Sequence, residues 1–127
     1  MSRKKIESFE DLWVWQKGIE AVKRIYQITN EGAICRDFGL RDQLRRAAVS
    51  IPTNIAEAFE RASRKEYLLF LNIAKGSAGE VRSLLRVALE VGFLEECKYK
   101  ETNDLIVTLS RYLSNQISSI KNAEPSQ

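Results

Sequence analysis

The chain has 127 residues, with 20 basic and 17 acidic side chains, a net charge of +3 and no histidine. This length suits one domain, and 44% hydrophobic residues is too apolar a composition for a disordered chain. Two prolines and six glycines are too few for a sandwich of short strands, so the composition predicts a compact helical protein.

Residues 9–29 have the apolar periodicity of a first helix. Ser8 is placed to cap its start, and Asn30–Gly32 supplies a stop. The apolar residues recur at steps of three and four: Leu12, Trp15, Ile19, Val22 and Tyr26. Ile25 and Ile28 widen this stripe. Trp13 lies away from this stripe among charged residues, which is typical either of a contact at a helix end or of an interface anchor.

A connection over residues 32–38 leads to a second predicted helix over residues 39–62, which contains Pro52. An interior proline costs about 3 kcal/mol, because a backbone hydrogen bond is lost and the ring clashes with the preceding turn. We therefore expect a helix that is kinked at Pro52, or two helices that meet at Ser50 and Ile51.

A polar lane borders the apolar face of this second helix. Its members are Gln43, Arg46, Ser50, Asn54, Glu57 and Arg61. Polar side chains that gather around a residue unfavourable to the helix, here Pro52, are typical of functional sites. The alternative is structural: Ser50 and Asn54 hydrogen-bond to the disturbed backbone, while Glu57 pairs with an arginine.

A third helix is predicted from the capping box Ser63–Glu66 to Val91, with Gly92 as its stop. Beside its main apolar face runs a second lane: Leu69, Ile73, Gly76, Leu84 and Val87. This lane indicates either a thick core or an interface with another subunit. Because Glu80 lies in the same lane, we expect it to form a buried pair with an arginine that fixes helix or subunit register.

The last predicted helix begins between Glu95 and Lys100 and carries an apolar stripe to Ile120. Four helices of about 20 residues with short connections favour an all-α fold, an antiparallel up-down-up-down four-helix bundle. We expect one domain over residues 1–127, with frayed ends at about 1–7 and 122–127.

The sequence contains few residues in arrangements that could catalyse a reaction. Without histidine, Glu57, Glu60 and Glu80 lack the Glu-x-x-His pairs of di-iron bundles, and no nucleophile–base constellation is visible. Cys35 and Cys97 form no metal-binding motif, so two reduced thiols or one disulfide both remain open. We expect no enzyme activity, no metal, no cofactor and no small-molecule substrate.

The N-terminus lacks the apolar core of a signal peptide, and no segment has the length and hydrophobicity of a spanning helix. The expected location is the cytoplasm, without membrane contact.

The basic excess lies in the N-terminal tail and over residues 36–65. The side chains there that could contact phosphates are Arg41, Arg45, Arg61, Arg64 and Lys65. A net charge of +3 is modest for a nucleic-acid-binding protein. A closed ring would repeat any basic patch once per subunit, which makes a weak surface on one subunit more effective.

The segment Arg45–Glu57, RRAAVSIPTNIAE, resembles the signature of the four-helix bundle proteins encoded in bacterial 23S rRNA intervening sequences. Further landmarks are similar to those of that family: Phe9, Leu12, Trp15, Gln16 and Lys17, Phe38–Leu40, the capping box at Ser63, Gly76 and Ser77 with Glu80, and Gly92–Leu94. The similarity covers nearly the whole chain. Ala58 and Gly79 depart from the pattern, because the family commonly has glycine at the first position and a larger residue at the second.

The resemblance implies an up-and-down four-helix fold and a homopentameric ring. It also implies kinship with accessory proteins of diversity-generating retroelements, which are basic pentamers that associate with reverse transcriptase and nucleic acid. It carries over no catalytic residue.

These observations lead us to expect a non-enzymatic homo-oligomer, a pentamer, that binds RNA, DNA or a nucleic-acid-processing partner such as a reverse transcriptase. The candidate interface residues are Trp13, Leu69, Ile73, Gly76 and Leu84. The alternative is a purely structural oligomer or a protein-interaction adaptor without affinity for nucleic acid.

Overall fold

The computed structural model describes residues 5–123, and every regular element in this range is helical. A short 3₁₀ helix, η1, precedes five α-helices: η1 Phe9–Asp11, α1 Trp13–Ile28, α2 Gly32–Arg36, α3 Phe38–Glu60, α4 Arg64–Glu90 and α5 Glu96–Asn122. The prediction of an all-α chain is confirmed. Of the ends predicted to be frayed, residues 1–4 and 124–127 lie outside the described residues, 5–7 precede η1 without helix, and Asn122 is the last residue of α5.

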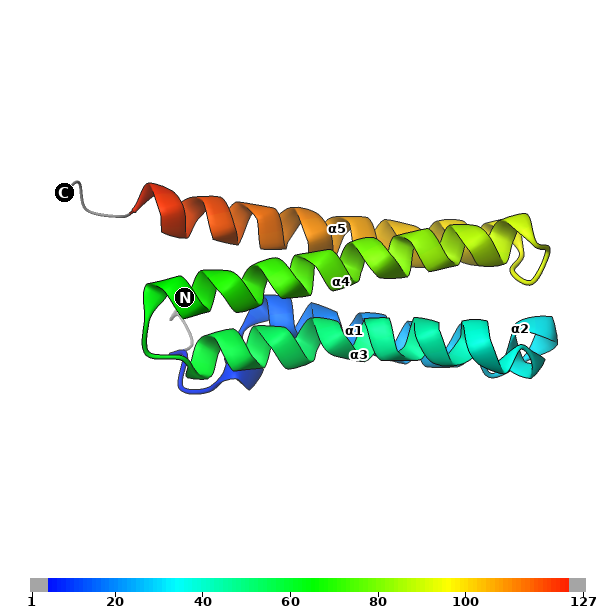
Figure 1. The fold of residues 1–127 in the computed structure, drawn as a ribbon, viewed down its shortest axis with the longest axis horizontal. Coiled ribbons are helices and arrows are strands. Elements are labelled where there is room, and N and C mark those ends of the chain that lie inside the picture. The colour runs from blue at the N-terminus through cyan, green and yellow to red at the C-terminus, as the bar shows by residue number, and fades with distance from the viewer. Residues whose placement is uncertain (1–4, 124–127) are drawn as a thin grey trace.

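The four long helices lie side by side along their lengths (Figure 1). The turn between α3 and α4 lies at one end of the molecule, and α2 and the turn between α4 and α5 lie at the other (Figure 1). α3 packs against both α1 and α4, and α5 packs against both α4 and α1. Each long helix therefore has two neighbours, and its apolar residues face the space enclosed by all four.

The core is built mainly from aliphatic side chains of these helices. Its largest fully buried apolar members are Ile25, Ile34, Leu44, Ile51, Ile55, Leu71, Val81, Leu85, Ile106, Leu109 and Leu113. Tyr26, which the periodicity assigns to the buried stripe of the first helix, is exposed, whereas Ile25 and Ile28 of the same predicted face are buried together with Gly18 and Ala21. The most buried side of α1 thus lies toward one edge of the predicted face, where Gly18 approaches Pro52 of α3, while Trp15 is partly buried against the core.

The first helix begins later than predicted. Leu12 has extended backbone angles, φ −76° and ψ 129°, which separate η1 from α1. The Asp11 carboxylate accepts the Ser8 N–H at 3.1 Å and the Glu7 N–H at 2.9 Å, so the polar residues cap η1 rather than α1. The predicted loop over residues 32–38 contains α2, because Ile34 inserts into the core and holds this turn of helix against the bundle.

α3 is one continuous helix through Pro52, so the alternative of two helices meeting at Ser50 and Ile51 is wrong. Pro52 cannot donate to the Ala48 carbonyl, and the two residues after it add side-chain hydrogen bonds to the next two carbonyls. Thr53 Oγ1 donates to the Val49 carbonyl at 2.8 Å, and Asn54 Nδ2 donates to the Ser50 carbonyl at 2.8 Å. The kink itself stays a prediction.

α4 begins with half of the predicted capping box and ends at the predicted glycine, since the Glu66 carboxylate accepts the Ser63 hydroxyl at 3.1 Å rather than the Ser63 N–H. The Ser63 hydroxyl accepts the Glu66 N–H at 3.1 Å, which satisfies a donor that the helix cannot. Gly92 adopts φ +80°, and the next N–H, from Phe93, donates to the Ala88 carbonyl at 2.8 Å. A left-handed glycine followed by such a bond terminates helices efficiently.

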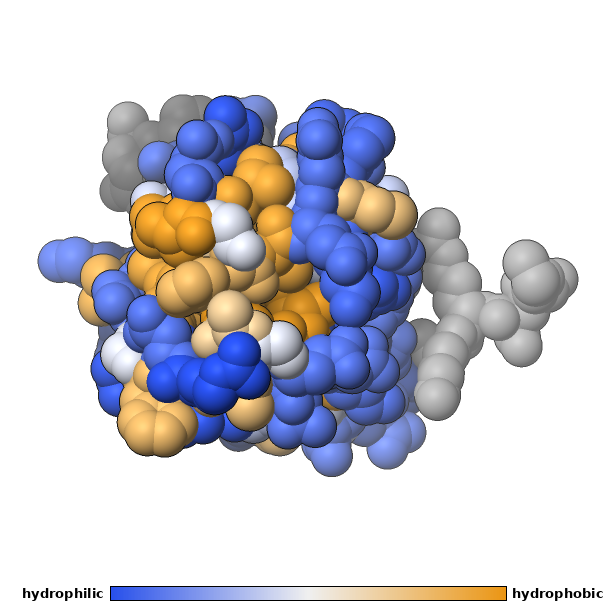
Figure 2. Space-filling model, turned by 90° about the vertical axis from the view of Figure 1, so that its right-hand side faces the viewer, coloured by the Kyte–Doolittle hydropathy of each residue, from blue (hydrophilic) through white to orange (hydrophobic). Residues whose placement is uncertain are grey.

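Figure 2 looks onto the end of the bundle that carries α2 and the turn between α4 and α5, and apolar side chains gather at its centre inside a hydrophilic rim. Ile34 and Leu94 are buried here, while Phe38 and Val91 are exposed. α2 and the turn between α4 and α5 therefore cover this end of the core with Ile34 and Leu94, and they leave Phe38 and Val91 open to solvent. No helix within residues 5–123 is long and apolar enough to cross a bilayer.

Candidate functional site

A groove runs along the outer face of α3 beside Tyr26 of α1, with a volume of about 660 Å³. Its lining residues are Tyr26, Asp42, Arg45, Arg46, Val49, Ser50, Thr53 and Asn54. We call it the α3 groove. The α3 residues recur at steps of one, three and four, which places them on one side of a helix. Polar and basic side chains predicted separately from the sequence therefore meet here.

Arg45 ties the end of α1 to α3. Its Nε donates to Thr29 Oγ1 at 2.9 Å and its Nη2 donates to the Thr29 carbonyl at 3.4 Å. Its guanidinium lies 4.5 Å from the centre of the exposed Tyr26 ring, which is within cation–π range. The buried Thr29 hydroxyl in turn donates to the Ile25 carbonyl at 2.6 Å. Arg45 is therefore a fixed positive charge in the groove wall.

Arg46 is the exposed cation of the groove and makes no ion pair or side-chain hydrogen bond with any residue in the described range. The nearby Asp42 carboxylate accepts a hydrogen bond from Arg41 Nε at 2.9 Å. This bond, with further attraction to Arg41, Arg46 and Arg45, lowers the pKa of Asp42. Arg41 also donates to the Cys35 carbonyl at 3.1 Å. The Arg41 guanidinium is therefore held by hydrogen bonds within the chain, while Arg46 faces solvent.

The deeper wall of the groove is a small hydroxyl–amide network. The Ser50 and Ser77 hydroxyls share a hydrogen bond of 2.8 Å that links α3 to α4, and Asn54 Nδ2 donates to Ser50 Oγ at 2.9 Å. Sequence reasoning missed the part played by Ser77. Its signal was available, because a serine at position 77 stands between Ala74 and Ala78 on the buried face of α4.

The remaining members of the predicted polar cluster lie elsewhere. Gln43 is exposed, and Glu57 pairs with Arg61 at 2.8 Å. The prediction of a buried Glu80–arginine pair is wrong for the single chain, because Glu80 is exposed on α4. Its lane faces solvent instead of a neighbouring helix.

The five basic candidates form two groups, not one patch. Arg41 and Arg45 lie near the start of α3, whereas Arg61, Arg64 and Lys65 lie at the turn after it. Sixteen residues of helix separate Arg45 from Arg61, or about 24 Å. Arg61 makes ion pairs with Glu57 at 2.8 Å and Glu66 at 3.7 Å, while Arg64 and Lys65 have exposed side chains.

Most of the predicted interface lane on α4 is exposed. Leu69 is 54% exposed and Ile73 is 41% exposed. Leu84 is 9% exposed and belongs to the core, so its assignment to the interface lane is corrected. The exposed positions, which we call the α4 stripe, are Leu69, Ile73, Gly76, Glu80, Val87 and Val91. Trp13, the other predicted interface residue, is exposed at the start of α1 and packs against Tyr112 of α5.

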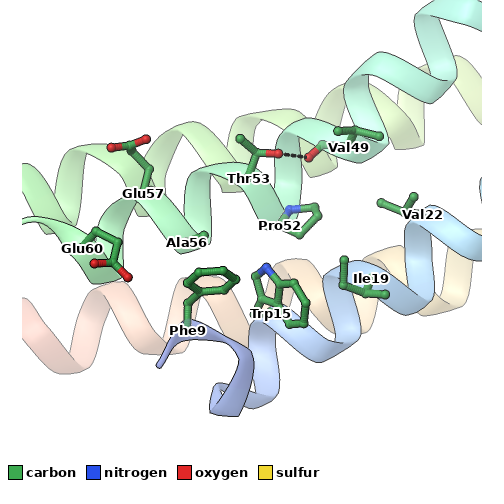
Figure 3. A pocket seen from close by; sticks show the side chains of 10 residues that line it. All are labelled: Phe9, Trp15, Ile19, Val22, Val49, Pro52, Thr53, Ala56, Glu57 and Glu60. Atoms are coloured by element: carbon green, nitrogen blue, oxygen red, sulfur yellow. Dashed lines mark hydrogen bonds between the residues drawn. The ribbon is translucent and has the colours of Figure 1, made fainter. Parts of the chain in front are cut away.

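A second, more apolar groove lies between α1 and α3, with a volume of about 430 Å³ (Figure 3). Phe9 packs edge-on against Trp15 at 5.3 Å between ring centres, and Glu57 and Glu60 stand toward one end of the groove (Figure 3). Pro52, which lines this groove, also lies close to α1, since a Cβ added to Gly18 would be 3.2 Å from Pro52 Cβ. The sequence did not reveal this close approach of α1 to the proline.

Cys35 is half-buried and Cys97 is exposed, and both are free thiols. No group of three His, Cys, Asp or Glu side chains within residues 5–123 is arranged to hold a metal ion.

The fold and its grooves define an all-helical bundle protein with an arginine-bearing groove along α3 and exposed apolar residues on α4. More specifically, the chain belongs to the family described as 23S rRNA-intervening sequence protein, whose family model matches residues 10–115. The family resemblance stated from the sequence is thereby confirmed.

The chain is similar to a solved protein of unknown function from the S23 ribosomal protein family of Bacteroides thetaiotaomicron. The two share 26% sequence identity with a TM-score of 0.76, over 82% of this chain and 97% of the other. No curated protein matches the sequence.

Proposed function

We propose that this chain is a non-enzymatic antiparallel up-down-up-down bundle, bent at Pro52, that assembles into a cytoplasmic homopentamer and binds RNA. The observation that carries the proposal is the α3 groove. There an exposed Arg46 lies beside the fixed charge of Arg45, an exposed aromatic ring and neutral hydrogen-bonding groups.

This combination suits a polynucleotide. Guanidinium groups contact phosphates, and aromatic rings and amides contact bases. A second basic group, Arg64 and Lys65, lies at the turn after α3, so an RNA strand of several nucleotides that follows α3 would meet both groups. The family description refers to an intervening sequence of 23S rRNA, so RNA is the nucleic acid to test first.

The α4 stripe supports self-association. Four of its six members are large apolar residues that are exposed in the single chain. Leu69 and Ile73 lie about one turn apart, and Val87 and Val91 repeat that spacing about five turns later on the same side of α4, which lets the four contact another helix along one line. Assembly would also repeat the α3 groove around a ring, so that one RNA strand meets several copies.

The test combines RNA titration at several salt concentrations with sedimentation of the free protein. The variant Arg46→Gln with Lys65→Gln removes two exposed charges, and Arg82→Gln is a control that removes one exposed charge from α4. We expect the double variant to reduce the slope of log affinity against log salt by about 0.7 for each lost phosphate contact. Unchanged binding and slope in the double variant would refute the assignment of the groove.

The α4 stripe also favours the alternative, a purely structural oligomer or a protein-interaction adaptor without affinity for nucleic acid. Apolar exposure on this scale accounts for assembly without any ligand. A sedimenting oligomer that binds no RNA at low salt would select this alternative.

A further inference from the structure

A second hollow, away from the α3 groove, lies where the start of α1 meets the later turns of α5 and the start of α4. Its volume is about 620 Å³, within the range of small-ligand pockets. We call it the aromatic cleft, and its polar and aromatic lining is Trp13, Tyr67, Tyr112, Asn115, Gln116 and Ser119. It contains no residue of α3, so it is separate from the proposed RNA groove.

The aromatic rings of the cleft are open to solvent. Trp13 is 42% exposed and Tyr112 is 46% exposed, although their ring centres are only 4.2 Å apart. The planes are tilted by 47°, so the two rings do not cover each other as a parallel stack would. Exposing two large aromatic rings is unfavourable unless something covers them.

The polar groups of the cleft are neutral and available. Asn115 and Ser119 make no side-chain hydrogen bond to any residue of the described chain, and Gln116 makes a single long bond of 3.5 Å to the Tyr67 hydroxyl. Amides and hydroxyls both donate and accept hydrogen bonds. None of the lining residues is charged. A positive group lies at the rim, because the Nζ of Lys17, which pairs with Glu20 at 3.0 Å, is 5.3 Å from the centre of the Trp13 ring.

This chemistry matches a nucleobase. Unpaired bases are bound by stacking on aromatic side chains while neutral donors and acceptors read their edges, and a cation at the rim meets the phosphate. We infer that the aromatic cleft binds one unstacked nucleobase. The inference rests on the proposed function, since it assigns to the RNA ligand a single-stranded segment that the α3 groove alone does not require.

The first measurement uses the intrinsic fluorescence of Trp13. The chain has two tryptophans, so Trp15→Phe leaves Trp13 as the reporter. We expect AMP, and more tightly a short oligoadenylate strand, to change its emission. Comparison of the two shows whether the cleft takes free nucleotides or bases within a strand. Emission that neither probe alters would overturn the inference.

The second measurement compares single-stranded oligoadenylate with the same strand annealed to oligouridylate. We expect Tyr112→Ala to weaken single-strand binding about tenfold and duplex binding little, because stacking contributes only where a base is unpaired. Tyr112→Phe retains the ring and should bind as the parent does. Asn115→Ala is a milder test that should alter the preference among bases. Equal binding by all three variants would overturn the inference.

The two proposals fail separately. If Arg46→Gln weakens RNA binding and Tyr112→Ala does not, the proposed function stands and the cleft inference falls. If AMP alters Trp13 emission but no RNA binds, the cleft stands as a nucleotide site and the proposed function falls. If Tyr112→Ala instead dissociates an oligomer, the cleft is an interface between copies and the inference is wrong.

Discussion

The contact between Gly18 and Pro52 leads to a test in which two similar substitutions have opposite effects. Replacing a helical glycine by alanine gains about 1 kcal/mol of helix propensity. At Gly18 the new methyl would lie 3.2 Å from Pro52 Cβ and 3.4 Å from its Cα and Cδ. These separations are shorter than the optimum of about 3.5–4.0 Å between carbon atoms. Overpacking of this kind costs about 1–3 kcal/mol.

Gly79 is the matched control, because no heavy atom lies within 4 Å of its added Cβ and the propensity gain remains. The free energies of unfolding of Gly18→Ala and Gly79→Ala should therefore differ by about 1–3 kcal/mol. For a chain of this size that corresponds to melting temperatures about 4–12 °C apart. Circular dichroism melts, recorded at equal protein concentration because assembly shifts stability, measure the difference. If Gly18→Ala melted as high as Gly79→Ala, the close approach of α1 to α3 would be refuted.

Three further predictions concern the assembly, a helix cap and acid stability. Ile73→Glu places a charge in the α4 stripe and should lower the sedimenting mass while leaving helix content unchanged; an oligomer of unaltered mass would count against the stripe. Ser63→Ala removes the acceptor for the Glu66 N–H and should destabilise the fold by about 1 kcal/mol in urea titration, with Ser63→Asp restoring it. The Arg41 guanidinium lowers the pKa of Asp42 in the folded protein. The ionised Asp42 therefore stabilises the fold above the pKa that it has in the unfolded chain, and this stabilisation is lost as the pH falls through its pKa in the folded protein. Asp42→Asn should therefore flatten the loss of stability below about pH 4, and an acid titration unchanged by Asp42→Asn would contradict this.

Features set by neighbouring residues were predictable from the sequence. The start and end of α4 depend on Ser63 and Gly92, which act within one helical turn, and the structure has both in those roles. The cluster of Ser50 and Asn54 around the proline was predictable for the same reason.

Features set by contacts between distant segments were not predictable. Periodicity gives the width of an apolar face but not which edge of it meets a neighbour, so Tyr26 was expected inside and Glu80 in a buried pair. The α2 helix depends on Ile34 reaching the core, which no local signal encodes. The approach of Gly18 to Pro52 joins residues of two helices whose relative position only the folded chain defines.

The order in which the helices pack has a consequence for folding and for chain engineering. Three of the four packed pairs of long helices join successive long helices, and only the contact of α1 with α5 joins the two ends of the chain. Local contacts of this kind are typical of rapid folding, with closure of α5 onto α1 as the step that spans the whole sequence. Because α1 begins and α5 ends at the same end of the bundle (Figure 1), a short linker could connect them. A circular permutant opened in the turn between α4 and α5 should keep every pair of packed helices.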